Sequence, residues 1–270
     1  MTLLRQRRSD VAAPASSLGR QQGRPPTPLD ELAALARPAT CDLVSSDLFD
    51  TVLLRDRSTE TVRLAEASRR AAPLLGLDPD AVVSLRWTMQ TSVYRAVAVE
   101  RPSGEATLAR ITATMATAFG LDREAAEVLR RTEVEVDASH LLPNRPLLEV
   151  LDAAQDAGVP VVAVSDTYYS EVDLRQLLAA VVGDHRFRAV YSSADLGATK
   201  HVGSIFPRVS ELERVDPSRV LHVGDSGTAD VRMAAAAGWT PVHLPRSTAY
   251  LRGRRIAALR ALPLVLRRDR

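Results

Sequence analysis

A chain of 270 residues is long enough for one large domain or for a domain with an insertion. Its hydrophobic share of 46% is ample for a core, which must be aliphatic because aromatic residues supply only 4%. The single cysteine, Cys41, excludes an intrachain disulfide. No apolar run approaches the roughly 18 residues of a membrane-spanning helix, so we expect a cytoplasmic protein with no transmembrane segment.

The net charge of +2 is unevenly distributed along the chain. Residues 1–30 carry five Arg against two Asp, and residues 249–270 carry seven Arg against one Asp, so the middle is acidic. Basic ends can bind nucleic acid or an anionic membrane, but they are more often solvated tails. We therefore predict a flexible basic leader over residues 1–26 and rank a nucleic-acid or membrane-associated function third.

The first predicted helix begins at Thr27 as cap, with Pro28 in the first helical position, and ends before Pro38. A short apolar strand then follows in LVSSDLFDTVLLR, residues 43–55. It ends at Asp47, where a polar turn begins. Taken alone, this stretch fits a ligand-binding strand end and an ordinary Asx turn equally well.

The segment 56–142 has apolar residues at helical spacing and no strand-like alternation. Helix-start signals recur along it, at Ser58, Asp78, Ser103 and Asp122. We predict that this segment forms an all-helical insertion, which would cover one edge of the rest of the protein.

After Asn144 the chain alternates between predicted helices and apolar strands. The strands are expected at residues 159–166, 188–193, 219–225 and 240–244, and the helices at residues 145–158, at 171–183, from Lys200 onward and at 228–238. This order predicts a parallel sheet with right-handed crossovers and helices on both faces. The expected fold is a three-layer, Rossmann-like α/β core, residues 27–55 and 143–248, with the helical cap inserted and a basic segment at 249–270. That last segment would cover the sheet edge, or dock on a partner or an acidic lipid surface.

Oxygen-bearing side chains stand at the ends of three predicted strands, at Asp47, Ser165 and Asp225. The carboxyl ends of parallel strands share one edge, so these residues should meet in one pocket. Lys200 follows another strand and is the only lysine among 35 basic residues. A compact ammonium kept where all other cations are arginine indicates a specific task.

The segment VGDSGTAD adds a second carboxylate, Asp230, five residues after Asp225. Carboxylate oxygens from Asp47 and Asp225, with backbone carbonyls and waters, suit Mg²⁺. Asp230 could instead be a helix-start charge favoured by the helix dipole, and the two roles can coexist.

In type, order and spacing, these residues resemble the four motifs of the haloacid dehalogenase superfamily over roughly residues 42–245. The quoted matches are Asp47-x-x-x-Thr51, Ser165, Lys200, and Gly224-Asp225 with Asp230. The helical insertion is similar to the helical cap of that superfamily. The phrase DLFDTVLLR looks most like a branch of predicted hydrolases often found beside glycosyltransferases.

The resemblance implies hydrolysis of a small phosphorylated metabolite, such as a sugar phosphate, through an aspartyl-phosphate on Asp47. It implies that Ser165 and Lys200 bind the phosphoryl oxygens, helped by Asp166 and the backbone near Leu48. The implied Mg²⁺ ligands are Asp47, the backbone carbonyl of Phe49, Asp225, and Asp230 directly or through water.

One position departs from the phosphatases of that superfamily, which carry a general acid where this chain has Phe49. Such a group contributes roughly 10²–10⁴-fold to rate. This departure leaves three alternatives open. The substrate has a good leaving group; Asp50, Asp166 or a cap residue donates the proton; or the protein is a phosphate-binding or regulatory module with weak or no turnover. Dehalogenases also lack this acid and need no metal, but the pair Gly224-Asp225 argues against them. Asp50 itself stands where the family commonly has glycine.

Other polar and aromatic residues give weaker signals. The five histidines show no metal-ligand spacing, which favours ordinary structural roles. Arg86 in the insertion, and Tyr168 and Tyr169 after Ser165, could face substrate or pack in a core. The sequence determines neither the substrate nor the oligomeric state.

Overall fold

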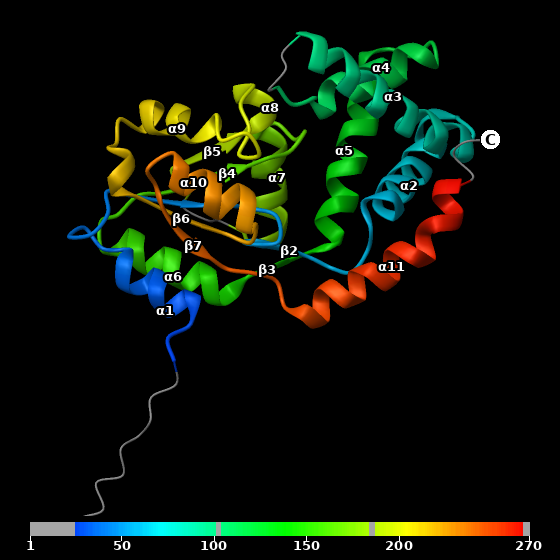
Figure 1. Ribbon diagram of the computed structural model, residues 1–270. Coiled ribbons are helices and arrows are strands. Elements are labelled where there is room, and N and C mark those ends of the chain that lie inside the picture. The colour runs from blue at the N-terminus through cyan, green and yellow to red at the C-terminus, as the bar shows by residue number, and fades with distance from the viewer. Residues whose placement is uncertain (1–24, 101–103, 184–186, 267–270) are drawn as a thin grey trace, which may run out of the picture.

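The computed structural model describes residues 25–100, 104–183 and 187–266 (Figure 1). Nearly all of the predicted leader lies outside these ranges, as do the expected helix start at Ser103 and residues 267–270 of the basic C-terminal segment. Within the described ranges, no helix is both long and apolar enough to cross a membrane.

The core is a parallel sheet of five strands in the order β5-β4-β1-β6-β7. Its strands are β1 (Leu43–Ser46), β4 (Val161–Ser165), β5 (Ala189–Ser192), β6 (Val220–Gly224) and β7 (Thr240–His243). The three central strands are buried along their whole length, which explains their nearly continuous apolar sequences. In the register, Ser46 pairs with Ala163 on one side and with Val223 on the other, so β1, β4 and β6 end close together. The predicted α/β fold with a parallel sheet is confirmed.

Helices cover both faces of this sheet. One face packs against α1 (Pro28–Leu35), α6 (Arg145–Asp156) and α7 (Glu171–Val181). The other face packs against α9 (Ile205–Glu213) and α10 (Met233–Ala236), with Trp239 between them and the strands. Capping boxes at Thr27 and Ser170 satisfy the first amides of α1 and α7.

Four α-helices lie between the first strand and the remainder of the sheet: α2 (Glu60–Ala71), α3 (Pro79–Glu100), α4 (Leu108–Ala118) and α5 (Arg123–Ser139). A short 3₁₀ helix, η1 (Ala72–Leu75), follows α2. We call this block the helical insert. It has a separate apolar core around Val93, Ile111 and Met115, and it lies beyond the carboxyl ends of the strands (Figure 1).

Two short strands that the sequence does not predict connect the insert to the core. β2 (Leu53–Arg55) pairs antiparallel with β3 (Leu141–Pro143), and Arg55 lies opposite Leu141. Strands of three residues are too short to display an alternating pattern, which is why this ribbon was not foreseen. The chain therefore enters and leaves the insert side by side.

Two predicted helices around the site differ from the structure. The helix expected at Lys200 begins at Ile205, after a short α8 (Ser193–Leu196) and a loop whose Gly197 and Gly203 adopt left-handed φ of 61° and 81°. The helix expected at residues 228–238 opens with a π-helical turn, η3 (Gly227–Arg232), directly after β6. A short 3₁₀ helix, η2 (Pro217–Arg219), precedes β6. The last element is α11 (Thr248–Leu266), which packs against α2 (Figure 1).

Candidate active site

Asp47 lies immediately after β1 and is only 5% exposed. Its Oδ2 accepts a hydrogen bond of 2.8 Å from the Thr51 hydroxyl, and its Oδ1 lies 2.5 Å from Lys200 Nζ. The Asp47 amide donates to the Val223 carbonyl at 2.9 Å, which ties the end of β1 to β6. Both carboxylate oxygens are therefore held in fixed directions at the edge of the sheet.

Lys200 lies in the loop between α8 and α9 and is 3% exposed. Its ammonium lies between Asp47 Oδ1 at 2.5 Å and Asp230 Oδ1 at 2.6 Å. Burial alone would lower the pKa of Lys200, but the two carboxylates more than offset this effect and raise it above the ordinary value. The single lysine of the chain is therefore a buried bridge between two acidic residues.

Asp166 holds the loop that carries Lys200. Its two carboxylate oxygens accept backbone hydrogen bonds from Lys200 N–H at 2.7 Å and His201 N–H at 2.9 Å. These contacts position Lys200 from the end of β4. The predicted role of Asp166 in binding phosphate stays a prediction.

Asp230 lies in the π-helical turn η3, with its carboxylate directed back toward the end of β6. Its Oδ2 accepts from the Ser226 amide at 2.9 Å, and its Oδ1 lies 3.2 Å from His222 Nε2 as well as beside Lys200. Burial would raise the pKa of Asp230, but Lys200 and His222 hold it well below the ordinary value. A π-turn is rare and frequently marks a functional site.

His222 is a residue whose place at the site the sequence did not reveal. It is fully buried in β6, where its Nδ1 lies 2.9 Å from Ser45 Oγ and its other ring nitrogen faces Asp230. Phe206 and Trp239 pack their rings around the imidazole. Metal-ligand spacing cannot detect a residue that contacts the site through a carboxylate. The one signal in the sequence was a polar ring inside an otherwise apolar strand.

Gly224 is required by the close approach of Asp230. A Cβ at position 224 would lie 2.3 Å from Asp230 Cγ, whereas a Cβ at Gly227 would meet nothing closer than 3.9 Å. We expect Gly224→Ala to destabilise the protein by about 1–3 kcal/mol, because the buried carboxylate must move away from Lys200. Urea unfolding of both variants checks this expectation. Gly227→Ala serves as the control, and equal midpoints for the two variants would contradict the close packing.

Asp225 completes a group of three carboxylates. One oxygen each from Asp47, Asp225 and Asp230 lie within 4.8 Å of one another. Burial, with the neighbouring Asp47 and Asp230 carboxylates, raises the pKa of Asp225 to about 7. Lys200 is the one ammonium that pairs with this group in the described part of the chain, so the formal excess is two negative charges. The group could hold a metal ion.

Ser165 lies at the end of β4 with its side chain buried. Its Oγ has no hydrogen-bond partner among the described residues. A buried hydroxyl without a partner is costly, and a ligand oxygen is one group that would satisfy it. Leu48, also predicted at the phosphate site, is buried, and its carbonyl accepts the amides of Val52 and Leu53 that shape the turn after Asp47.

Phe49 and Asp50 follow Leu48 in this turn and have different surroundings. The Phe49 ring is buried, with the Arg55 guanidinium 4.0 Å above its centre and the Tyr169 ring 6.1 Å away. Asp50 adopts a left-handed φ of 64°, and its carboxylate contacts Tyr250 and Arg254 of α11. Its predicted proton-donor role stays a prediction, as does the metal-ligand role of the Phe49 carbonyl.

The helical insert closes over this edge through buried polar contacts. The Tyr169 hydroxyl donates to Asp137 Oδ2 at 3.3 Å, and Arg63 Nε donates to Asp137 Oδ1 at 2.6 Å. The sequence did not decide whether Arg86 faces substrate or packs in a core. In the structure Arg86 is buried and donates two hydrogen bonds of 2.7 Å to Glu133. A cavity of only about 10 Å³ remains where Arg63, Tyr168 and Tyr169 meet, which is room for roughly one water.

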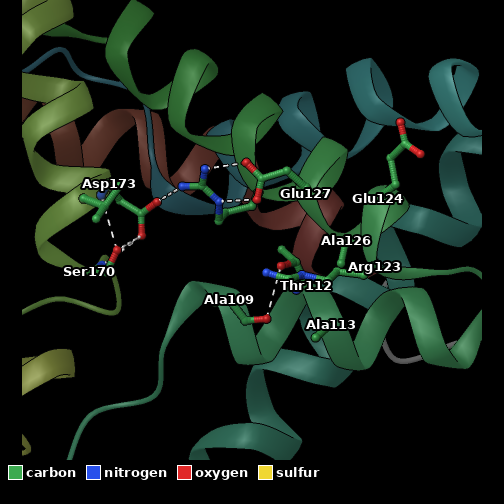
Figure 2. Close-up of a pocket in the computed structure, with 11 residues that line it drawn as sticks. Ala109, Thr112, Ala113, Arg123, Glu124, Ala126, Glu127, Ser170 and Asp173 are labelled. Atoms are coloured by element: carbon green, nitrogen blue, oxygen red, sulfur yellow. Dashed lines mark hydrogen bonds and ion pairs between the residues drawn. The ribbon is translucent and has the colours of Figure 1, made fainter.

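A much larger pocket, of about 910 Å³, lies away from the carboxylates, between α4, α5 and the start of α7 (Figure 2). Alanines 109, 113 and 126 form an apolar part of its lining. At one side Arg130 pairs with Asp173 and with Glu127. Neither the three carboxylates nor Lys200 line it, so size alone does not identify the candidate site.

The chain was compared with protein-family models, with curated proteins and with solved structures. A family model described as haloacid dehalogenase-like hydrolase matches residues 41–238. No curated protein matches the chain.

Solved structures similar to this chain include the L-2-haloacid dehalogenase from Xanthobacter autotrophicus, at 19% identity and a TM-score of 0.48, covering 82% of each chain. A mutant HAD family enzyme from Bacteroides thetaiotaomicron, in complex with magnesium and inorganic phosphate, matches at 14% identity and 0.49, covering 78% of this chain and 98% of that one. A predicted phosphoglycolate phosphatase from Haemophilus somnus 129pt matches at 17% identity and a TM-score of 0.42, covering 74% of this chain and 83% of that one.

Proposed function

The chain belongs to the haloacid dehalogenase-like hydrolases, whose family model spans residues 41–238, and on this premise we propose that it is a Mg²⁺-dependent phosphohydrolase. Its substrate would be a small phosphorylated metabolite. The observation that carries the proposal is the meeting of Asp47, Asp225 and Asp230 around Lys200 at the carboxyl edge of the sheet.

The chemistry of this donor set fits Mg²⁺. Hard carboxylate oxygens are the ligands that this ion prefers. When all three carboxylates are ionised, they exceed Lys200 by two negative charges, which is the charge that one divalent cation neutralises; the Asp225 carboxylate forms no ion pair with any described residue. When bound, the metal would neutralise charge on the phosphoryl oxygens.

Three side chains of the protein would carry out the remaining steps of the reaction. Asp47, oriented by Thr51 and Lys200, would attack phosphorus and form an aspartyl-phosphate as the bond to the leaving oxygen breaks. Ser165 Oγ, which lacks a partner, and the Lys200 ammonium would bind the phosphoryl oxygens. Water would then cleave the aspartyl-phosphate to release phosphate and restore Asp47.

We propose that the helical insert moves to admit substrate to Asp47. Asp47, Ser165, Lys200 and Asp230 are all buried, and the cavity beside Tyr169 holds about one water. Opening between insert and core, followed by closure over substrate, would exclude bulk water during reaction. We therefore propose that residues 56–142 act as a cap over the core of residues 27–55 and 143–248.

Phe49 limits the leaving groups that this site can expel. Its phenyl ring, on which Arg55 stacks, has no proton to donate to a departing oxygen. Substrates whose leaving group is already stable as an anion, such as acyl phosphates, would therefore be preferred. The same observation favours a second candidate function, a phosphate-binding or regulatory module with weak or no turnover. Membership of the branch found beside glycosyltransferases, and a cytoplasmic location, stay predictions.

We expect the wild-type protein to release phosphate from acetyl phosphate or an aryl phosphate at least roughly 10²-fold faster than from glycerol phosphate, because general-acid help is missing. Activity should require Mg²⁺ and disappear with EDTA. A colorimetric phosphate assay measures both properties.

The same preparation is tested for halide release from 2-chloropropionate. Halide release without phosphate release would refute the phosphohydrolase. Mg²⁺-dependent binding of a phosphate analogue by calorimetry, without release from any ester or anhydride, would instead establish the second candidate.

A further inference from the structure

The inner face of α11 contacts the turn that carries the candidate nucleophile. The Tyr250 hydroxyl donates to Asp50 Oδ1 at 2.9 Å, and Arg254 donates to Asp50 Oδ2 at 3.3 Å. Arg246, just before the helix, has its Nε 3.8 Å from Asp50 Oδ1 and stacks 3.7 Å from the Tyr250 ring. The Asp50 carboxylate also accepts a hydrogen bond of 3.3 Å from the Arg55 amide of its own turn, and its side chain is 12% exposed.

Asp50 has an unusual backbone conformation within this turn. Its φ of 64° is one that residues other than glycine rarely adopt, although Asp and Asn tolerate it best. Its amide donates to the Leu53 carbonyl at 2.8 Å, and the next residue, Thr51, orients Asp47. A displacement of Asp50 would therefore be passed to Asp47 through one intervening residue.

The same helix also holds the chain where it leaves the core for the insert. Arg246 donates to the Arg55 carbonyl at 3.1 Å, and the Tyr250 hydroxyl lies 3.3 Å from the Asp56 carbonyl. Gly253 lies so close to Arg57 that a Cβ there would come 2.6 Å from the guanidinium Nε. Because α11 also packs against α2, it contacts both the catalytic turn and the first helix of the insert (Figure 1).

We propose that Tyr250 and Arg254 are positioning residues, which act through Asp50 to hold the turn of residues 47–51 in its reactive shape. The claim about rate rests on the proposed phosphohydrolase function, whereas the claim about the shape of the turn does not. Placement errors of about 1 Å can cost roughly 10²-fold in rate, so a remote ion pair can control catalysis. Asp50 then serves as the anchor of the turn, and no proton transfer is required of it.

A double-mutant cycle between Arg254→Ala and Asp50→Asn tests the coupling. Asparagine keeps the tolerance for positive φ and removes the charge. We expect each single variant to lower kcat for acetyl phosphate by roughly 5–20-fold with little change in KM. The double variant should be no worse than Asp50→Asn alone, because Asp50→Asn already removes the charge with which Arg254 pairs. Arg254→Lys should recover part of the loss.

The matched control is Arg255→Ala, which removes an exposed arginine from the same helix and should leave kcat unchanged. A second measurement, amide hydrogen exchange of residues 48–53, requires no turnover. Exchange there should accelerate in both Arg254→Ala and Asp50→Asn and remain unchanged in Arg255→Ala.

Multiplicative losses in the double variant, or unchanged exchange in Arg254→Ala, would overturn the proposal. If the wild type releases no phosphate, the exchange data alone decide the claim about the turn, and the failure then belongs to the proposed function.

Discussion

Asp47→Asn should lower phosphate release by a factor on the order of 10⁴ or more. An amide oxygen is a poor nucleophile, so the aspartyl-phosphate cannot form at a useful rate. The fold should survive, because the asparagine carbonyl can still accept from Thr51 and Lys200 keeps its second partner, Asp230. Steady-state release from acetyl phosphate at saturating Mg²⁺ measures the effect.

Asp42→Asn is the matched control for that substitution. Asp42 directly precedes β1, its side chain is 54% exposed, and it pairs with Arg219 at 2.7 Å on the far end of the strand. Its replacement should leave the rate unchanged. Beryllofluoride, which mimics a phosphoryl group on a carboxylate, should bind the wild type and Asp42→Asn but not Asp47→Asn. Near-normal turnover in Asp47→Asn would remove Asp47 from the role of nucleophile.

Lys200→Met should reduce both stability and activity more than any surface substitution. The ammonium bridges two buried carboxylates, and its removal leaves Asp47 and Asp230 without the cation that pairs with both. Breaking a buried pair in this way costs roughly 3–5 kcal/mol. The free energy of unfolding in urea, measured with and without Mg²⁺, checks the prediction. Mg²⁺ should stabilise the variant more than the wild type, because it neutralises the same carboxylates.

Arg208→Met provides the comparison for Lys200→Met. Arg208 is exposed and pairs with Glu211 at 3.2 Å, so its loss should change the free energy of unfolding by less than about 1 kcal/mol. If the two variants unfold at the same urea concentration, Lys200 contributes no more than a solvated ion pair does, and the buried bridge has no energetic importance.

The sequence predicted the parts of the site that depend on strand order. Asp47, Ser165 and Asp225 end strands of one parallel sheet, so the topology alone brings them to one edge. Lys200 was found through composition, as a single exception among arginines. Side-chain type and strand ends are both visible in a linear pattern, so the sequence alone predicts this part of the site.

What the sequence missed depends on close approach in space. The linear pattern predicted an ordinary helix around Asp230, whereas the structure has a π-turn there, in which Asp230 packs against Gly224 and accepts from the Ser226 amide. His222 looked like a core residue until its ring was found beside Asp230. The contacts between Asp50 and α11 join residues about 200 positions apart, and no local periodicity encodes such a pair.

The β2–β3 ribbon has a consequence for engineering. Arg55 and Leu141 are cross-strand partners, and Cα atoms in such a pair lie only about 4.5–5.5 Å apart. A two-residue hairpin turn spans that gap, so a turn of this length would join the two strands in place of the 85 intervening residues without changing the path of the rest of the chain.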